Sequence, residues 1–145
     1  MDIARHMALL DELCVRPFPA DHGSSHGGPR GPGHHVVVLA GSHSLRADPA
    51  SWAATVEQIE AECEALRERL TARWGPPGLW NLQTVLLRTE REEIPEPWAW
   101  LSARAGTAWL WEVEGTGRWA AVAVADRDGA DGVQLLAVVS GIPPV

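Results

Sequence analysis

The segment from 49 to 74 constrains the fold most strongly, because its apolar residues recur with the period of an α-helix. They follow one another at spacings of four or three: Trp52, Val56, Ile59, Cys63, Leu66, Leu70 and Trp74. Such spacing places them on one stripe along the helix. Asp48 is suited to cap the helix start, Pro49 to open the first turn, and Gly75 with two following prolines to end it. The sequence therefore predicts an amphipathic helix over 49–74.

A helix with one apolar stripe needs an apolar surface to cover it. The spacing is compatible with a coiled coil, but apolar runs lie on both sides of the helix, and this favours packing against a sheet. The runs with strand character are 36–40, 79–89, 107–113, 118–126 and 133–139. Glycine-containing turns separate the last three, which predicts a meander. Two of these runs alternate little, so the sheet is expected to be covered on one face and partly on the other.

Shorter segments complete the predicted architecture. Residues 3–14 show the apolar spacing of a short N-terminal helix, and 97–104 of another. Residues 20–34 are rich in glycine, proline and histidine and are predicted to form a mobile loop. The sequence thus predicts a single α+β domain over 1–145, with about five mostly antiparallel strands and the long helix packed across them.

The long helix is also longer than its sheet is wide. Its residues span ~39 Å at the α-helical rise, whereas five strands span ~20 Å. We therefore expect the helix to run diagonally or to overhang the sheet, and an overhang is a candidate contact surface.

Composition excludes several chemistries. All 12 basic residues are arginine and no tyrosine is present, a bias typical of a GC-rich bacterial coding sequence. Without lysine the chain cannot form a Schiff base, anchor pyridoxal phosphate or build a phosphate-binding P-loop. We expect no cofactor. The two cysteines, Cys14 and Cys63, fall on apolar stripes and are expected to be buried, reduced thiols.

Charge and hydropathy limit the expected partners and location. The net charge of −7 argues against nucleic acid, since phosphate binding relies on a basic surface. No apolar run approaches the ~20 residues of a membrane span, and the N-terminus carries acids where a signal peptide would be apolar. The expected location is cytoplasmic. An acidic surface suits a basic protein partner, and the pattern is also compatible with a homodimer.

Two groups of residues are candidates for an interaction surface. The long helix carries exposed acids opposite its apolar stripe, at Glu57, Glu60 and Glu64. Five of the eight tryptophans lie between 98 and 119, namely Trp98, Trp100, Trp109, Trp111 and Trp119. Trp109 and Trp111 share a strand face, and Trp119 is expected to pair with them across the hairpin. Trp98 and Trp100 cannot both face inward from a regular helix, so one is expected to be partly exposed. The five tryptophans are therefore predicted to form either part of the hydrophobic core or an interaction groove.

The histidines are the candidates for a metal site. His22, His26, His34 and His35 lie in or beside the glycine-rich loop, and imidazole binds zinc, nickel and copper well. The loop would have to return His22 or His26 to His34 or His35. Ser42 follows a strand, as a hydrolase nucleophile does, but its surroundings lack the G-x-S-x-G pattern.

The sequence supports two functions. The first is a non-enzymatic, acidic cytoplasmic protein-interaction module, with an immunity-like or regulatory role. The alternative is a small-molecule- or metal-binding protein, or a hydrolase, with a site between the histidine-rich loop and the tryptophan cluster. Convergence of the histidines on one point would favour the alternative.

Overall fold

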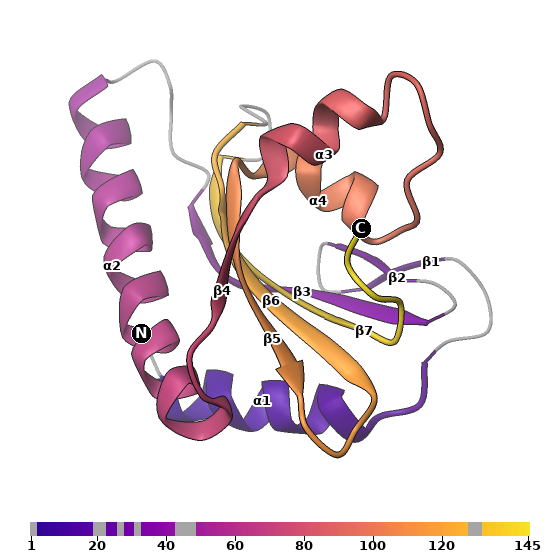
Figure 1. Cartoon of the computed structure of the whole chain (residues 1–145). Helices are drawn as coiled ribbons and strands as arrows, with labels where there is room; N and C mark the ends of the chain where they lie inside the picture. The colour runs from indigo at the N-terminus through magenta and orange to yellow at the C-terminus, as the bar shows by residue number, and fades with distance from the viewer. Residues whose placement is uncertain (1–2, 19–22, 26–27, 31–32, 43–48, 128–131) are drawn as a thin grey trace.

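The centre of the molecule is a five-stranded antiparallel sheet (Figure 1). The computed structural model describes residues 3–18, 23–25, 28–30, 33–42, 49–127 and 132–145. The strands lie in the order β3 (His34–Ser42), β7 (Val133–Ser140), β6 (Arg118–Ala125), β5 (Thr107–Val113) and β4 (Gly78–Asn81). Each strand is antiparallel to its neighbours. The predicted α+β class, the antiparallel sheet and the C-terminal meander are confirmed.

Helices cover both faces of this sheet. The helices α1 (Ile3–Val15) and α2 (Pro49–Trp74) pack on one face, here called the α2 face. The helices α3 (Leu82–Arg88) and α4 (Trp98–Arg104) pack on the other, the α4 face. Figure 1 shows the two pairs on opposite sides of the strands. The sheet is therefore the middle of three layers, which explains why its inner strands are apolar on both faces.

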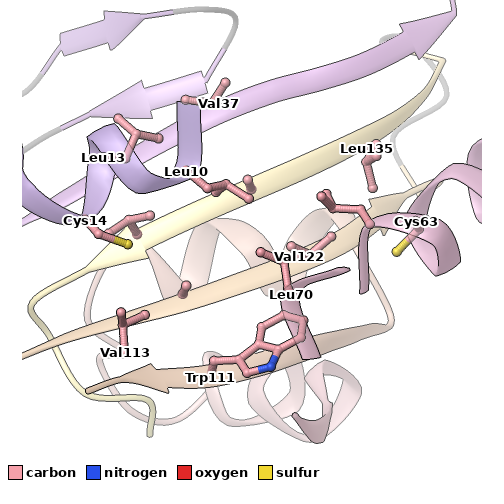
Figure 2. Close-up of a cluster of buried hydrophobic side chains, with 14 of the residues drawn as sticks. Leu10, Leu13, Cys14, Val37, Cys63, Leu70, Trp111, Val113, Val122 and Leu135 are labelled. Carbon is pink, nitrogen blue, oxygen red and sulfur yellow. The ribbon is translucent and has the colours of Figure 1, made fainter. Parts of the chain in front are cut away.

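Strand β6 shows how the two faces are separated. Ala120 and Val122 belong to the cluster on the α2 face, whereas Ala121 and Ala123 belong to the cluster on the α4 face. Successive side chains of a strand point to opposite faces, so one apolar run serves both cores. Figure 2 shows the α2-face cluster, where side chains of α1, α2 and the strands meet.

Helix α2 has the predicted bounds. Its buried residues are Ile59, Cys63, Leu66 and Leu70, and Gly75 follows in a left-handed conformation, with φ +91°. None of the residues from 50 to 58 is buried, and Figure 1 shows the first turns of α2 extending past the sheet. The overhang expected from the helix length is present.

One predicted strand is wrong over most of its length. The run 79–89 forms strand β4 only to Asn81 and then the helix α3. Asn81 adopts an extended backbone and its Oδ1 accepts a hydrogen bond from the N–H of Gln83 at 2.9 Å, which is the geometry of a helix N-cap. Leu82 and Val85 are then buried at a helical spacing. The N-cap at Asn81 and the helical spacing of Leu82 and Val85 explain why this segment forms a helix and not a strand.

The loop predicted over 20–34 contains two short strands. β1 (Gly23–Ser25) and β2 (Gly28–Arg30) pair antiparallel with each other. The rest of that range up to residue 32 lies outside the described residues, so its predicted mobility stays a prediction. In the described part of the chain, no helix combines the length and apolarity that crossing a membrane requires.

Candidate functional site

A groove between α2 and the sheet contains three of the residues that the sequence singles out. Its volume is about 470 Å³. The lining comes from α2, from β5 and from the end of β6: Glu60, Cys63, Glu64, Arg67, Gly106, Thr107, Trp109, Ala123, Val124, Asp126 and Arg127. Glu60 and Glu64 lie on the exposed side of α2, and the half-buried Trp109 comes from the neighbouring strand. The acidic helix face and one tryptophan therefore border the same groove.

Arg67 links the helix wall to the tryptophan. Its guanidinium carbon lies 4.2 Å from the centroid of the Trp109 ring, within the range of a cation–π contact. Glu64 approaches the same guanidinium only to 3.8 Å. The Glu64 side chain is 64% exposed, so its carboxylate remains accessible on the rim although Arg67 partly neutralises it.

The second arginine of the groove is held by the opposite layer. Arg127 Nη1 donates to the carbonyl of Ser102 at 2.9 Å, and its Nη2 donates to Gln83 Oε1. This arginine thus ties the end of β6 to α3 and α4. The groove has three carboxylates, with Asp126 as the third, against two guanidiniums, so its charge is net negative.

An exposed leucine of the edge strand β4 lies next to the tryptophan of this groove. Leu79 of β4 lies directly opposite Trp109 of β5, and directly opposed residues of a sheet point to the same face. The exposed fraction of Leu79 is 62%, high for a large apolar residue. We call Glu60, Glu64, Trp109 and Leu79 the groove surface. Glu57 is exposed on α2 but does not line the groove.

Two of the other tryptophans are core residues whose indole N–H groups bond to backbone. Trp111 is 3% exposed and donates to the carbonyl of Gly75 at 2.9 Å, where it joins the end of α2 to the sheet. Trp98 is fully buried on the α4 face and donates to the carbonyls of Ile142 and Pro143. A buried indole that has its hydrogen bond satisfied is a structural anchor.

The remaining two lie on the α4 face, so the five tryptophans do not form one cluster. Trp119 lies opposite Glu112, not opposite Trp111, and packs against the α4-face core. The predicted pairing of Trp119 with Trp109 and Trp111 is wrong, because the register places it on the other face. Trp100 is half buried with Arg104 4.2 Å above its ring. The prediction that one of the α4 tryptophans is partly exposed is confirmed.

The described histidines of the proposed metal site diverge. His34 lies opposite Ser140 and His35 opposite Val139 on β7, and adjacent strand residues point to opposite faces. His35 is buried beside Phe18, with ring centroids 5.2 Å apart. One ion could therefore be bound by His34 or by His35, but not by both. His22 and His26 lie outside the described residues, among which no group of three potential metal ligands is found.

Both cysteines are buried free thiols, as predicted. Burial raises the pKa of the Cys63 thiol to about 11, and it raises the pKa of Cys14 as well. A thiol is nucleophilic only as the thiolate, so Cys63 is protonated at neutral pH although it lines the groove. Figure 2 shows the two cysteines at opposite ends of the α2-face core.

Sequence reasoning missed Leu79, Arg67, Asp126 and Arg127 as parts of this site. Leu79 belongs to an apolar run predicted to be a strand, and the exposure of a single residue cannot be predicted from such a run. Arg67, Asp126 and Arg127 become neighbours only through the fold. No protein family, no curated protein and no solved structure matches this chain.

Proposed function

We propose that this protein is a non-enzymatic cytoplasmic interaction module that docks a basic protein partner on the groove surface. The supporting observation is that Glu60, Glu64 and Trp109 border one groove, with the exposed Leu79 directly beside the tryptophan. Protein interfaces commonly combine a central aromatic or aliphatic anchor with a polar rim. Here Trp109 and Leu79 serve as the anchor, and the carboxylates of α2 form the rim.

Electrostatics supports a basic partner. The chain has a net charge of −7, and from 50 to 66 the helix α2 carries four glutamates and no arginine. A field of one sign accelerates the encounter with a partner of opposite charge and repels like-charged competitors. An acidic domain that binds a single basic protein fits an immunity-like or regulatory role. The same charge disfavours nucleic acid and anionic membranes as partners.

The alternative function has less support. A small-molecule, metal or hydrolase site between the histidine-rich loop and the tryptophans needs these groups to converge. His34 and His35 belong to opposite faces of the sheet, and the tryptophans are divided between the same two faces.

Site-specific crosslinking tests the docking surface. A photoreactive residue is introduced at Leu79, and at Leu87 as a matched control, because Leu87 is similarly exposed, at 54%, but lies on α3 away from the groove. We expect the Leu79 variant, and not the control, to crosslink one basic protein in cells of the source organism. Equal crosslinking at both positions, or none at Leu79, would contradict the proposal.

Charge reversal then tests the rim with the purified partner. The double variant Glu60→Arg, Glu64→Arg should lower the association rate about tenfold or more, since rim charges act mainly on encounter. Glu68→Arg changes charge on the same helix outside the groove and should have a smaller effect. If raising the salt concentration leaves the wild-type association rate unchanged, the electrostatic part of the proposal fails.

A further inference from the structure

A second, larger cleft lies at the opposite edge of the sheet, between α1, β3 and α2. Its volume is about 700 Å³. The lining consists of Arg5, His6, Ala8, Leu9 and Glu12 of α1, Val37, Val38, Leu39 and Ala40 of β3, and Glu62 of α2. It shares no residue with the groove surface. Six of these ten residues are apolar, as in many small-molecule sites.

The β3 wall is an edge strand. Among the strands that the structure describes, β3 pairs with β7 on one side, and none of them continues this sheet on the other. Its register shifts between Val38 and Ala40, so that Leu39 is a bulge residue beside the cleft. Bulges bend an edge strand and oppose continuous pairing with another strand. The cleft is therefore better suited to a compact ligand than to a sixth strand.

Glu62 is the unusual group in this cleft. Its Oε2 atom is inaccessible to solvent and has no hydrogen-bond partner within the described structure. Three or four positions away along α2 stand Gln58, Ile59, Ala65 and Leu66, so no basic residue lies within reach on the same helix. A smaller cavity of about 280 Å³ also includes Glu62 and Ala40. The carboxylate thus stands where two hollows meet.

An unsatisfied, buried carboxylate oxygen is costly and uncommon in a folded protein. A positively charged donor that enters the cleft would remove this cost by a charge-assisted hydrogen bond. Glu12, the other acid of the cleft, is already paired with Arg16. Glu62 is therefore the acceptor that a ligand would use.

We propose that this cleft binds a primary ammonium group carried on a short apolar chain, with Glu62 accepting its hydrogen bond. Ala8, Leu9 and Leu39 would cover the apolar part of the ligand. The chain contains no lysine, so a second copy of it cannot supply a side-chain ammonium.

Titration with simple amines tests this site by heteronuclear NMR of the labelled full chain. n-Hexylamine, protonated at neutral pH, should shift the amide signals of Val37–Ala40 and Glu62. Hexan-1-ol and hexanoate should bind at least several-fold more weakly, since the first lacks the positive charge and the second reverses it. Glu62→Gln should weaken hexylamine binding about tenfold or more, as expected for a charge-assisted bond. Glu68→Gln, on the exposed side of the same helix, should leave it unchanged.

A stability measurement gives an independent readout. Without ligand, Glu62→Gln should raise the melting temperature relative to Glu68→Gln, because it replaces a carboxylate whose Oε2 is buried without a hydrogen-bond partner by a neutral amide. Saturating hexylamine should raise the melting temperature of the wild type more than that of Glu62→Gln. Equal hexylamine affinity in wild type and Glu62→Gln would overturn the proposal, and so would hexanol binding as tightly as hexylamine.

A final arm distinguishes the sources of the ammonium. A pentapeptide of threonine with one central lysine, acetylated at its N-terminus and amidated at its C-terminus so that the lysine carries its only charge, is compared with n-hexylamine. Tighter binding of the peptide, with slower hydrogen exchange of the β3 amides, would place the ammonium on a protein segment. Tighter binding of hexylamine would identify a free amine. Binding of neither compound would overturn the proposal, as would a stable dimer whose β3 amides are protected in the absence of any amine.

Discussion

Arg118 attaches the end of α1 to the sheet, and its removal should destabilise the fold measurably. Its Nη1 donates to the carbonyls of Leu13 at 2.7 Å and of Arg16 at 2.6 Å. Its guanidinium carbon lies 3.9 Å from the ring centroid of Phe18. The last carbonyls of a helix lack partners within the helix, and α1 is followed by Arg16 and Pro17 rather than by a glycine cap. Arg118 therefore provides the missing donors.

The expected magnitude follows from these contacts. A hydrogen bond to a charged group contributes about 1.5–3 kcal/mol, and a cation–π contact about 0.5–2 kcal/mol. One guanidinium makes all three contacts at a partly buried site, so their energies are not additive. We expect Arg118→Met, which keeps the apolar stem, to cost about 3 kcal/mol. For a domain of this size that corresponds to a fall in Tm of about 10 °C.

Urea unfolding and amide hydrogen exchange measure this effect. Arg104→Met is the matched control, because Arg104 likewise lies over an aromatic ring, that of Trp100, but donates a longer bond, of 3.3 Å, to the Trp100 carbonyl. The control should cost less than about 1 kcal/mol. In Arg118→Met the amides of α1 should lose protection more than those of β6. A cost equal to that of the control, or unchanged protection of α1, would refute the attachment role.

Three further substitutions test the fold. Leu70→Ala should lower the free energy of unfolding by about 2–5 kcal/mol, since this side chain is fully buried on the α2 face. Leu87→Ala, at an exposed position, should change it by less than about 0.5 kcal/mol. Denaturant unfolding of the two variants measures the difference. Asn81→Ala removes the cap of α3 and should cost about 1 kcal/mol, while Asn81→Asp should retain most of the stability in the same assay. Burial lowers the pKa of His35 below its ordinary value of 6.5, and the charges of nearby arginines act in the same direction. The folded state then binds fewer protons than the unfolded state, so the free energy of unfolding should fall as the pH drops below about 6.5. Between pH 7 and pH 5 the urea midpoint of His35→Phe should therefore fall less than that of the wild type. An equal fall in both proteins would exclude His35 as the cause.

Local signals made much of the fold predictable. Helix α2 was placed at both ends because its apolar stripe, its proline start and its glycine stop agree, and agreement among local signals is what specifies a structure. The run after Gly78 was misassigned because leucine and valine in a short apolar run suit a strand and a helix equally. Asn81 was the readable signal there, since asparagine before such a run is a helix cap.

The sites were less predictable than the fold. The groove joins residues of α2 to Trp109 and Asp126, which are distant in sequence, so only the register of β4, β5 and β6 brings them together. The same register sends Trp119 to the opposite face. Glu62 was not distinguished from the other glutamates of α2, although it stands between Ile59 and Leu66 along the helix and so borders the buried stripe.

The position of Glu62 also explains how one helix serves two sites. Residues two apart on a helix differ by about 200° around its axis, so Glu62 points away from both Glu60 and Glu64. The buried stripe of Ile59, Cys63 and Leu66 fixes α2 on the sheet, and its two flanks then border the groove on one side and the cleft on the other. Glu62→Gln should therefore alter amine binding while leaving the groove surface intact. The double variant Glu60→Arg, Glu64→Arg should weaken binding of the basic partner while leaving amine binding unchanged. The two proposals can therefore be tested independently.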